Sequence, residues 1–187
     1  MNLHALPEEA LKEILALTEA KKRLELREEA SEKFMPFAHH VYENFIEGAH
    51  HRVIAEKLER VARGEIKRLI INMPPRHSKS EFASYLMPAW FLGRNPKLKI
   101  IQATHNTELA VRFGRKVRDL IDDPAYKEIF PETNLKEDNK GAGKWGTTAG
   151  AEYFAAGVGA AITGRGADLL IIDDPHSEQD ALSENAF

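Results

Sequence analysis

The stretch that decides the fold covers residues 69–80 and reads Leu-Ile-Ile-Asn-Met-Pro-Pro-Arg-His-Ser-Lys-Ser. Its first part belongs to Arg68–Asn72, a short β-branched apolar run of the kind found in buried parallel strands. A proline-rich loop follows, and a helix is predicted from about Lys79 to Leu92, kinked or ended early by Pro88. This order places the loop at the carboxyl end of a strand, where α/β sheets bind their ligands.

The loop has the chemistry of a phosphate-binding site. A loop that runs into a helix offers free backbone N–H groups and the positive end of the helix dipole to a phosphate. Lys79 is placed to reach the β- and γ-phosphates, and the Ser80 hydroxyl to hold Mg²⁺. The general pattern G-x-x-x-x-G-K-[ST] is not met, because Met73 and Ser78 stand at its two glycine positions. On the loop alone, a proline-rich connection into a capped helix is the alternative.

A second predicted strand, Leu169–Ile172, ends at a pair of acids, Asp173 and Asp174. A carboxylate at the end of a buried strand can bind Mg²⁺ directly or through water. A second acid beside it can orient or deprotonate an attacking water. A solvated Asp-Asp-Pro turn is the alternative for this segment alone. Taken together, the loop and the two acids predict hydrolysis of a magnesium nucleotide.

The composition limits the classes of protein that the chain can belong to. Its 187 residues are 43% hydrophobic and 29% charged, which is typical of a folded globular domain. The formal net charge of −3 excludes a polycation held on DNA by bulk charge, so any contact with nucleic acid needs a local patch. The absence of cysteine excludes disulfides and thiolate metal sites. No apolar run approaches the ~20 residues of a membrane span, so we expect a cytoplasmic protein without a membrane partner.

The remaining sequence predicts a helical arm at residues 1–36 and an α/β domain over residues 37–187. Strands that alternate with helices favour a mostly parallel sheet. A helical stretch is expected at 37–63, broken near Gly48 and stopped by Gly64, and a strand is expected at 99–103. The next helix would be capped by Thr104 or Asn106, and its apolar stripe would consist of Leu109, Phe113, Val117 and Leu120. Residues 131–150 are expected to form an exposed loop, followed by two short strands between Glu152 and Thr163 that turn at 157–159.

These motifs resemble the large terminase subunit of tailed bacteriophages, the ATPase that packages double-stranded DNA into a preformed capsid. The resemblance is carried by residues 69–80 and by residues 164–175, which read Gly-Arg-Gly-Ala-Asp-Leu-Leu-Ile-Ile-Asp-Asp-Pro. Further similar stretches are Phe113–Arg118, Ile129–Pro131 and 157–159, so that it covers about residues 37–180. The Pro-Pro-Arg-His loop is distinctive, because terminases often depart from the glycine pattern in this way. The implied fold is a P-loop NTPase-like sheet with flanking helices.

The resemblance also implies a role for each residue of the loop and of the acid pair. The loop that holds ATP would consist of Pro75, Arg76, His77, Ser78, Lys79 and Ser80. Ser80 and Asp173 would hold Mg²⁺, and Arg76 matches an arginine that senses or stabilises the γ-phosphate. Asp174 stands where many relatives have a catalytic glutamate, which is one methylene longer, and Glu178 is a substitute candidate for that role.

Arg165, between two glycines, is the candidate arginine finger toward the ATP of a neighbouring subunit. A glycine-flanked turn residue in water is the alternative. The adenine contact is expected between residues 37 and 52, where His39, His40, His50 and His51 read as surface, packing or adenine-edge histidines. Adjacent helical residues point about 100° apart, which disfavours a metal site. The basic face of Arg112, Arg115, Lys116 and Arg118 is either a contact for DNA phosphates or a solvated helix face.

In ATPases of this class, the strand before the phosphate loop is flanked by strands that follow the paired acids in sequence. We therefore expect an incomplete sheet whose first strand has unpaired edges or needs a partner, and no nuclease domain. The expected function is the ATPase segment of a packaging motor, with double-stranded DNA, the portal protein and the small terminase subunit as partners. A homo-oligomeric ring is expected for the full-length protein, in the cytoplasm of the infected host. The alternatives are a truncated nucleotide-binding or interaction module without turnover, and another P-loop, helicase-like ATPase.

Overall fold

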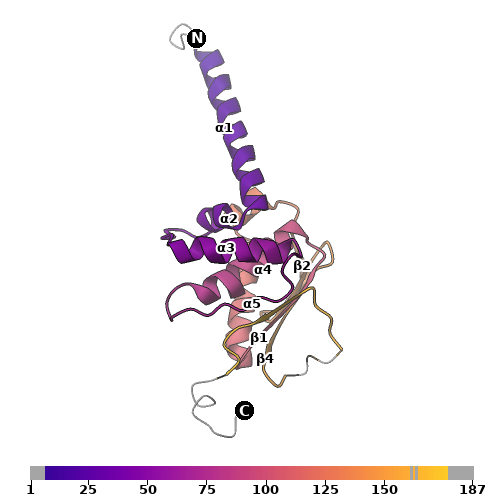
Figure 1. Cartoon of the computed structure of the whole chain (residues 1–187). Helices are drawn as coiled ribbons and strands as arrows, with labels where there is room; N and C mark the ends of the chain where they lie inside the picture. The colour runs from indigo at the N-terminus through magenta and orange to yellow at the C-terminus, as the bar shows by residue number, and fades with distance from the viewer. Residues whose placement is uncertain (1–6, 161, 163, 177–187) are drawn as a thin grey trace.

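The computed structural model describes residues 7–160, 162 and 164–176, which form an α/β fold with one mixed sheet and flanking helices (Figure 1). The strand order is β2-β3-β4-β1-β5. The strands are β1 (Lys99–Thr104), β2 (Leu135–Lys140), β3 (Lys144–Thr147), β4 (Glu152–Gly157) and β5 (Leu169–Ile172). The helices are α1 (Glu8–Glu32), α2 (Phe34–Val41), α3 (Ala49–Ala62), the π-helix η2 (Glu81–Leu86), α4 (Met87–Arg94), α5 (Thr107–Ile121) and α6 (Pro124–Ile129). The predicted α/β class is thereby confirmed.

The sheet is mixed, whereas the sequence predicted a mostly parallel sheet. β1 pairs in parallel with both β4 and β5, whereas β3 is antiparallel to both β2 and β4. The two antiparallel strands come from residues 131–150, which were wrongly predicted to be an exposed loop. Many residues of the two strands are polar, so their sequence lacks the alternation of apolar and polar residues that is typical of a strand. Leu135, Trp145 and Thr147 are nevertheless buried and hold this hairpin in the core.

The predicted strand at Arg68–Asn72 is not formed. This segment is extended, but it pairs with no strand in the part of the chain that the structure describes. Leu69 and Ile71 pack against the core while Ile70 between them is 85% exposed, so the side chains alternate as they would in a strand. A strand also needs a neighbour to accept its backbone hydrogen bonds, and the described residues supply none.

One part of the core lies between the sheet and α5. Ile100 and Gln102 of β1 are in register with Tyr153 and Ala155 of β4, and all four are buried. Gly114 of α5 allows the close approach, because a Cβ there would lie 3.1 Å from the Tyr153 ring and 2.7 Å from the carbonyl oxygen of Ala142. The Trp145 indole N–H donates to the Gly114 carbonyl at 3.0 Å, so the hairpin and α5 are joined at this point.

The long helix α1 extends away from the rest of the molecule (Figure 1). Only its last turn enters the core, where Ala30 is fully buried and its carbonyl accepts the indole N–H of Trp90 at 3.0 Å. Phe34 of α2 is also fully buried, and its ring meets Trp90 edge-on. Gly64 follows α3 with a φ of 75°, as expected of a helix stop. None of the helices among the described residues has the length and apolar character that a membrane span requires.

The helix predicted from about Lys79 to Leu92 is formed and continues to Arg94, and Pro88 does not end it early. The Met87 N–H bonds to the carbonyl of Phe82, five residues back, which closes the wide π-helix η2. Pro88 then lies in the first turn of α4, where its missing N–H costs little, and the helix continues to Arg94. Further along the chain, β4 ends at Gly157. The second strand predicted before Thr163 is not formed at residues 158–160 and 162, and residues 161 and 163 lie outside the part of the chain that the structure describes.

Candidate nucleotide-binding site

The loop after residue 73 and the acids after β5 meet at one end of the sheet. Lys79 Nζ lies 2.5 Å from Asp174 Oδ1 and 3.7 Å from Asp173 Oδ1. Lys79 is more than 90 positions away in sequence from the two adjacent acids. The parallel pairing of β1 with β5 fixes these acids at the carboxyl end of the parallel strands. A cation from the loop therefore faces two carboxylates at the place where α/β sheets bind ligands.

Asp173 is a buried carboxylate with defined partners. It is 6% exposed, its backbone N–H donates to Ala103 at 2.9 Å, and the Ser84 hydroxyl donates to its Oδ2 at 2.8 Å. A buried charge needs a counter-charge and hydrogen bonds to offset desolvation, and Lys79 and Ser84 supply them. One carboxylate oxygen thus faces the buried side, and the other faces Lys79.

Three residues of the site have strained backbones. Arg76, Ser78 and Asp174 have φ values of 63°, 65° and 44°, in the left-handed region that favours glycine. Such strain costs on the order of 1–3 kcal/mol per residue and is concentrated at functional sites. Ser78 holds the second glycine position of the general phosphate-loop pattern, so its positive φ gives a physical reason why glycine is usual there. Within the described residues, the N–H groups of Arg76 and Ser78 donate to no acceptor, so they are available to an anion.

The electrostatics keep the lysine charged. The hydrogen bond from Lys79 to Asp174, with the charges of Asp174 and Asp173, raises the pKa of the Lys79 ammonium above its usual value. The residues present fit a phosphate and its magnesium ion, because the ammonium that now neutralises the acids is the group that would bind the phosphate. Within the described residues, no three His, Asp or Glu side chains are grouped to hold a metal by themselves. Mg²⁺ would then be held by Asp173, the Ser80 hydroxyl, nucleotide oxygens and water, as is usual for magnesium nucleotides.

The other predicted site residues that the structure describes make no side-chain hydrogen bond or ion pair with Lys79, Asp173 or Asp174. His77 is exposed, and its Nδ1–H donates to the Pro75 carbonyl at 2.8 Å; Arg76 is also exposed. Arg165 does not join Lys79 and the acids, because its guanidinium lies over the ring of Phe154 on β4, 4.0 Å from the centroid. Glu178 lies outside the described residues.

Two residues at the end of β1 belong to the site, but the sequence analysis did not place them there. The backbone N–H of His105 donates to the Asp174 carbonyl at 3.1 Å, and the His105 ring lies 3.2 Å from the same oxygen. Asn106 was predicted only as a helix cap, and it does cap α5 by accepting the Leu109 N–H at 2.7 Å. A signal existed, since the residues after one parallel strand lie beside those after its neighbour.

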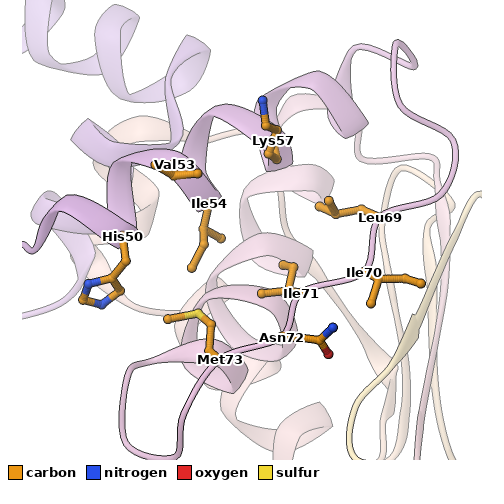
Figure 2. Close-up of a pocket in the computed structure, with 9 residues that line it drawn as sticks. All are labelled: His50, Val53, Ile54, Lys57, Leu69, Ile70, Ile71, Asn72 and Met73. Atoms are coloured by element: carbon orange, nitrogen blue, oxygen red, sulfur yellow. The ribbon is translucent and has the colours of Figure 1, made fainter.

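An apolar cleft lies beside the segment that leads into the loop (Figure 2). Its volume is about 340 Å³, and it lies between α3 and residues 69–73. Figure 2 shows Ile54 of α3 pointing toward Ile71 and Met73, with Ile70 pointing to the other side of the segment. His50, from the region expected to contact adenine, lines this cleft, whereas Lys79, Asp173 and Asp174 do not.

Of the predicted histidines and the predicted basic face, His51 and Lys116 have partners within the protein. His51 is buried, stacks on Phe82 and lies with its ring 3.9 Å from that of His50. Burial lowers the pKa of His51, as do the neighbouring imidazoles. On the basic face of α5, Lys116 is bonded to both oxygens of Glu81 at 2.8 and 2.9 Å, while Arg112 and Arg115 are exposed.

Comparisons of the chain with protein-family models, with curated proteins and with solved structures give no match. Any functional assignment therefore depends on the sequence motifs and on the geometry of the loop and the paired acids. The geometry that carries most weight is the contact of Lys79 with Asp173 and Asp174.

Proposed function

We propose that the chain binds ATP with magnesium and hydrolyses it, as the ATPase segment of a bacteriophage DNA-packaging motor with a P-loop NTPase-like fold. The observation that supports this most directly is the contact of Lys79 with both acids, 2.5 Å from Asp174 and 3.7 Å from Asp173. The terminase-like sequence of residues 69–80 and 164–175 supports the choice of motor over other nucleotide hydrolases.

Each residue has a role that follows from its position. Lys79 exchanges its bond to Asp174 for the phosphates, and the free N–H groups of the strained loop hold the same anion. Magnesium, when bound, supplies charge neutralisation on the transferred phosphoryl group. Asp174, freed from the lysine and 59% exposed, accepts a hydrogen bond from the attacking water and orients it. Arg76 adds positive charge beside the γ-phosphate.

The wider role is proposed from the resemblance. Double-stranded DNA, the portal protein and the small terminase subunit are the proposed partners. A homo-oligomeric ring is the proposed assembly, and the host cytoplasm is the proposed location. Arg165 is proposed to act on a neighbouring subunit's ATP, for which it would leave the face of Phe154.

The test is a titration of the chain with ATP and Mg²⁺, followed by steady-state hydrolysis. Lys79→Ala should abolish binding, and Asp174→Asn should bind nucleotide but lower the turnover by at least about tenfold. Lys97→Ala changes an exposed lysine that lies away from the acids, and it should leave both quantities unchanged. Retention of wild-type ATP affinity by a folded Lys79→Ala variant would contradict the site assignment.

A nucleotide-binding module without turnover is the second candidate. Two observations favour it: Asp174 is a methylene shorter than glutamate, and Arg165 is held over Phe154 rather than beside the acids. In that case the wild-type chain binds ATP·Mg²⁺ in a Lys79-dependent manner, but inorganic phosphate release stays at the level of the Asp174→Asn variant.

A further inference from the structure

Asp174 is held in its strained conformation from the end of β1. Its φ of 44° is unusual for a residue with a side chain, and something must hold it there. Its carbonyl oxygen accepts two N–H groups of one residue, the backbone N–H of His105 at 3.1 Å and the ring Nδ1 at 3.2 Å. The preceding residue, Asp173, is fixed in the sheet because its backbone N–H donates to the Ala103 carbonyl at 2.9 Å. His105 therefore contacts the peptide that carries the second acid, and not its carboxylate.

The ring of His105 can donate in this way only in one tautomer, and the cap of α5 selects that tautomer. Asn106 Oδ1 accepts the Leu109 N–H, which leaves the Asn106 amide nitrogen as the atom 2.8 Å from His105 Nε2. An amide NH₂ group only donates, so Nε2 must accept and carries no proton. In a neutral ring the proton is then on Nδ1, the atom that faces the Asp174 carbonyl.

We infer that His105, with its tautomer set by Asn106, is a positioning residue for Asp174 and for the water that Asp174 orients. The inference depends on the proposed hydrolysis for its effect on rate, but the Asn106–His105–Asp174 chain itself exists without nucleotide. A shift of a catalytic group by about 1 Å is enough to slow a reaction about a hundredfold, so the hold on this peptide bears directly on turnover.

Two kinds of variant separate the tautomer from the packing of the ring. Asparagine places its amide nitrogen where Nδ1 lies, whereas the longer glutamine places it near Nε2, so His105→Asn keeps the donor and His105→Gln loses it. Asn106→Asp keeps the oxygen that caps α5 and removes the donor to Nε2. Asn95→Asp, an exposed residue after α4, is the matched control for the added charge.

The experiment measures kcat and KM for ATP, together with the His105 ring ¹⁵N shifts and the Asp174 carbonyl ¹³C shift in the nucleotide-free full chain. The expected result is a protonated Nδ1 in the wild type, and loss of that tautomer in Asn106→Asp. His105→Gln and Asn106→Asp should lower kcat by about tenfold or more with KM changed less than about twofold, while His105→Asn restores most of the rate. Asn95→Asp should change neither quantity.

The inference is overturned if the wild type carries its proton on Nε2, or if His105→Gln and Asn106→Asp turn over ATP at the wild-type rate. If the wild type hydrolyses no ATP, the proposed function fails separately, and the ¹³C shift decides. A change of that shift in His105→Gln and Asn106→Asp, but not in His105→Asn, then supports the hold on Asp174. An unchanged shift in all three overturns it.

Discussion

The hydroxyl of Ser84 donates a 2.8 Å hydrogen bond to Asp173, so the helix that follows the phosphate loop holds the first acid from its buried side. Ser84 is fully buried, and no water is expected to replace it. We expect Ser84→Ala to lower the free energy of unfolding by about 1–3 kcal/mol, because it leaves a buried carboxylate oxygen without its donor. Urea denaturation measures this. Ser31→Ala, whose hydroxyl bonds at the surface of α1, is the control and should change stability little; equal losses in both variants would contradict the prediction.

The strain at Ser78 predicts that glycine stabilises this position. The left-handed conformation destabilises a folded protein by about 1–2 kcal/mol when the residue is not glycine. A glycine avoids this cost, but its greater conformational freedom in the unfolded chain offsets about 0.5–1 kcal/mol of the gain. Ser78→Gly should therefore raise the free energy of unfolding by up to about 1 kcal/mol. Ser80→Gly, at a helical φ of −70°, should lower it by about 0.5 kcal/mol. The two serines are two residues apart, so opposite signs in the same denaturation assay check the backbone argument, and the same sign would refute it.

His51 makes the fold sensitive to acid. Burial, followed by the charges of His50 and His77, lowers its pKa below that of the unfolded chain. The unfolded chain then binds the proton more readily, so the stabilising contribution is present above pH ~6.5 and is lost as the pH falls through the folded pKa. We expect the free energy of unfolding to fall between pH 7 and 5 in the wild type and to fall less in His51→Gln. Parallel stability curves for the two proteins would be inconsistent with this.

The buried tyrosines predict that the folded state loses stability at high pH. Burial first, and then the charge of Glu81, raises the pKa of Tyr85 to about 12, and burial also raises the pKa of Tyr126 and Tyr153. The folded state thus prefers neutral phenols, and this contribution is complete below pH ~10 and is lost as the pH rises from there. Tyrosinate absorbance should therefore appear together with the loss of helical circular dichroism. Tyr85→Phe should make the alkaline fall in stability shallower; gradual ionisation well before unfolding would contradict the assignment.

The sequence allowed those elements to be predicted whose local pattern matches their final environment. Asn106 caps α5 and Val117 lies on its buried stripe, as the helical spacing indicated. The hairpin of β2 and β3 was missed because Trp145 is buried among polar neighbours, and its burial depends on α5, which is distant in sequence. Arg68–Asn72 had a strand pattern but found no pairing partner among the described residues.

For the candidate site, the loop and the acids could be selected by their order and chemistry, and the structure places Lys79 beside both acids. Their catalytic roles stay predictions. The contact of His105 with Asp174 could be expected only once β1 was known to lie next to β5, and the tautomer of His105 depends on how the cap of α5 orients an amide. Nor does any pattern in the sequence indicate that Ser84, within the π-helix, meets Asp173.

The bond from Trp90 to the carbonyl of Ala30 gives the molecule a built-in optical reporter. The chain has two tryptophans, and the other, Trp145, is bonded to Gly114 beneath the sheet. Because each indole is buried at a different junction, their emission spectra distinguish two events. Release of α1 would expose Trp90 to water and shift its emission to the red, whereas the emission of Trp145 would change when α5 separates from the sheet. In a Trp145→Phe variant, the remaining fluorescence therefore reports on the contact between Trp90 and the last turn of α1 alone.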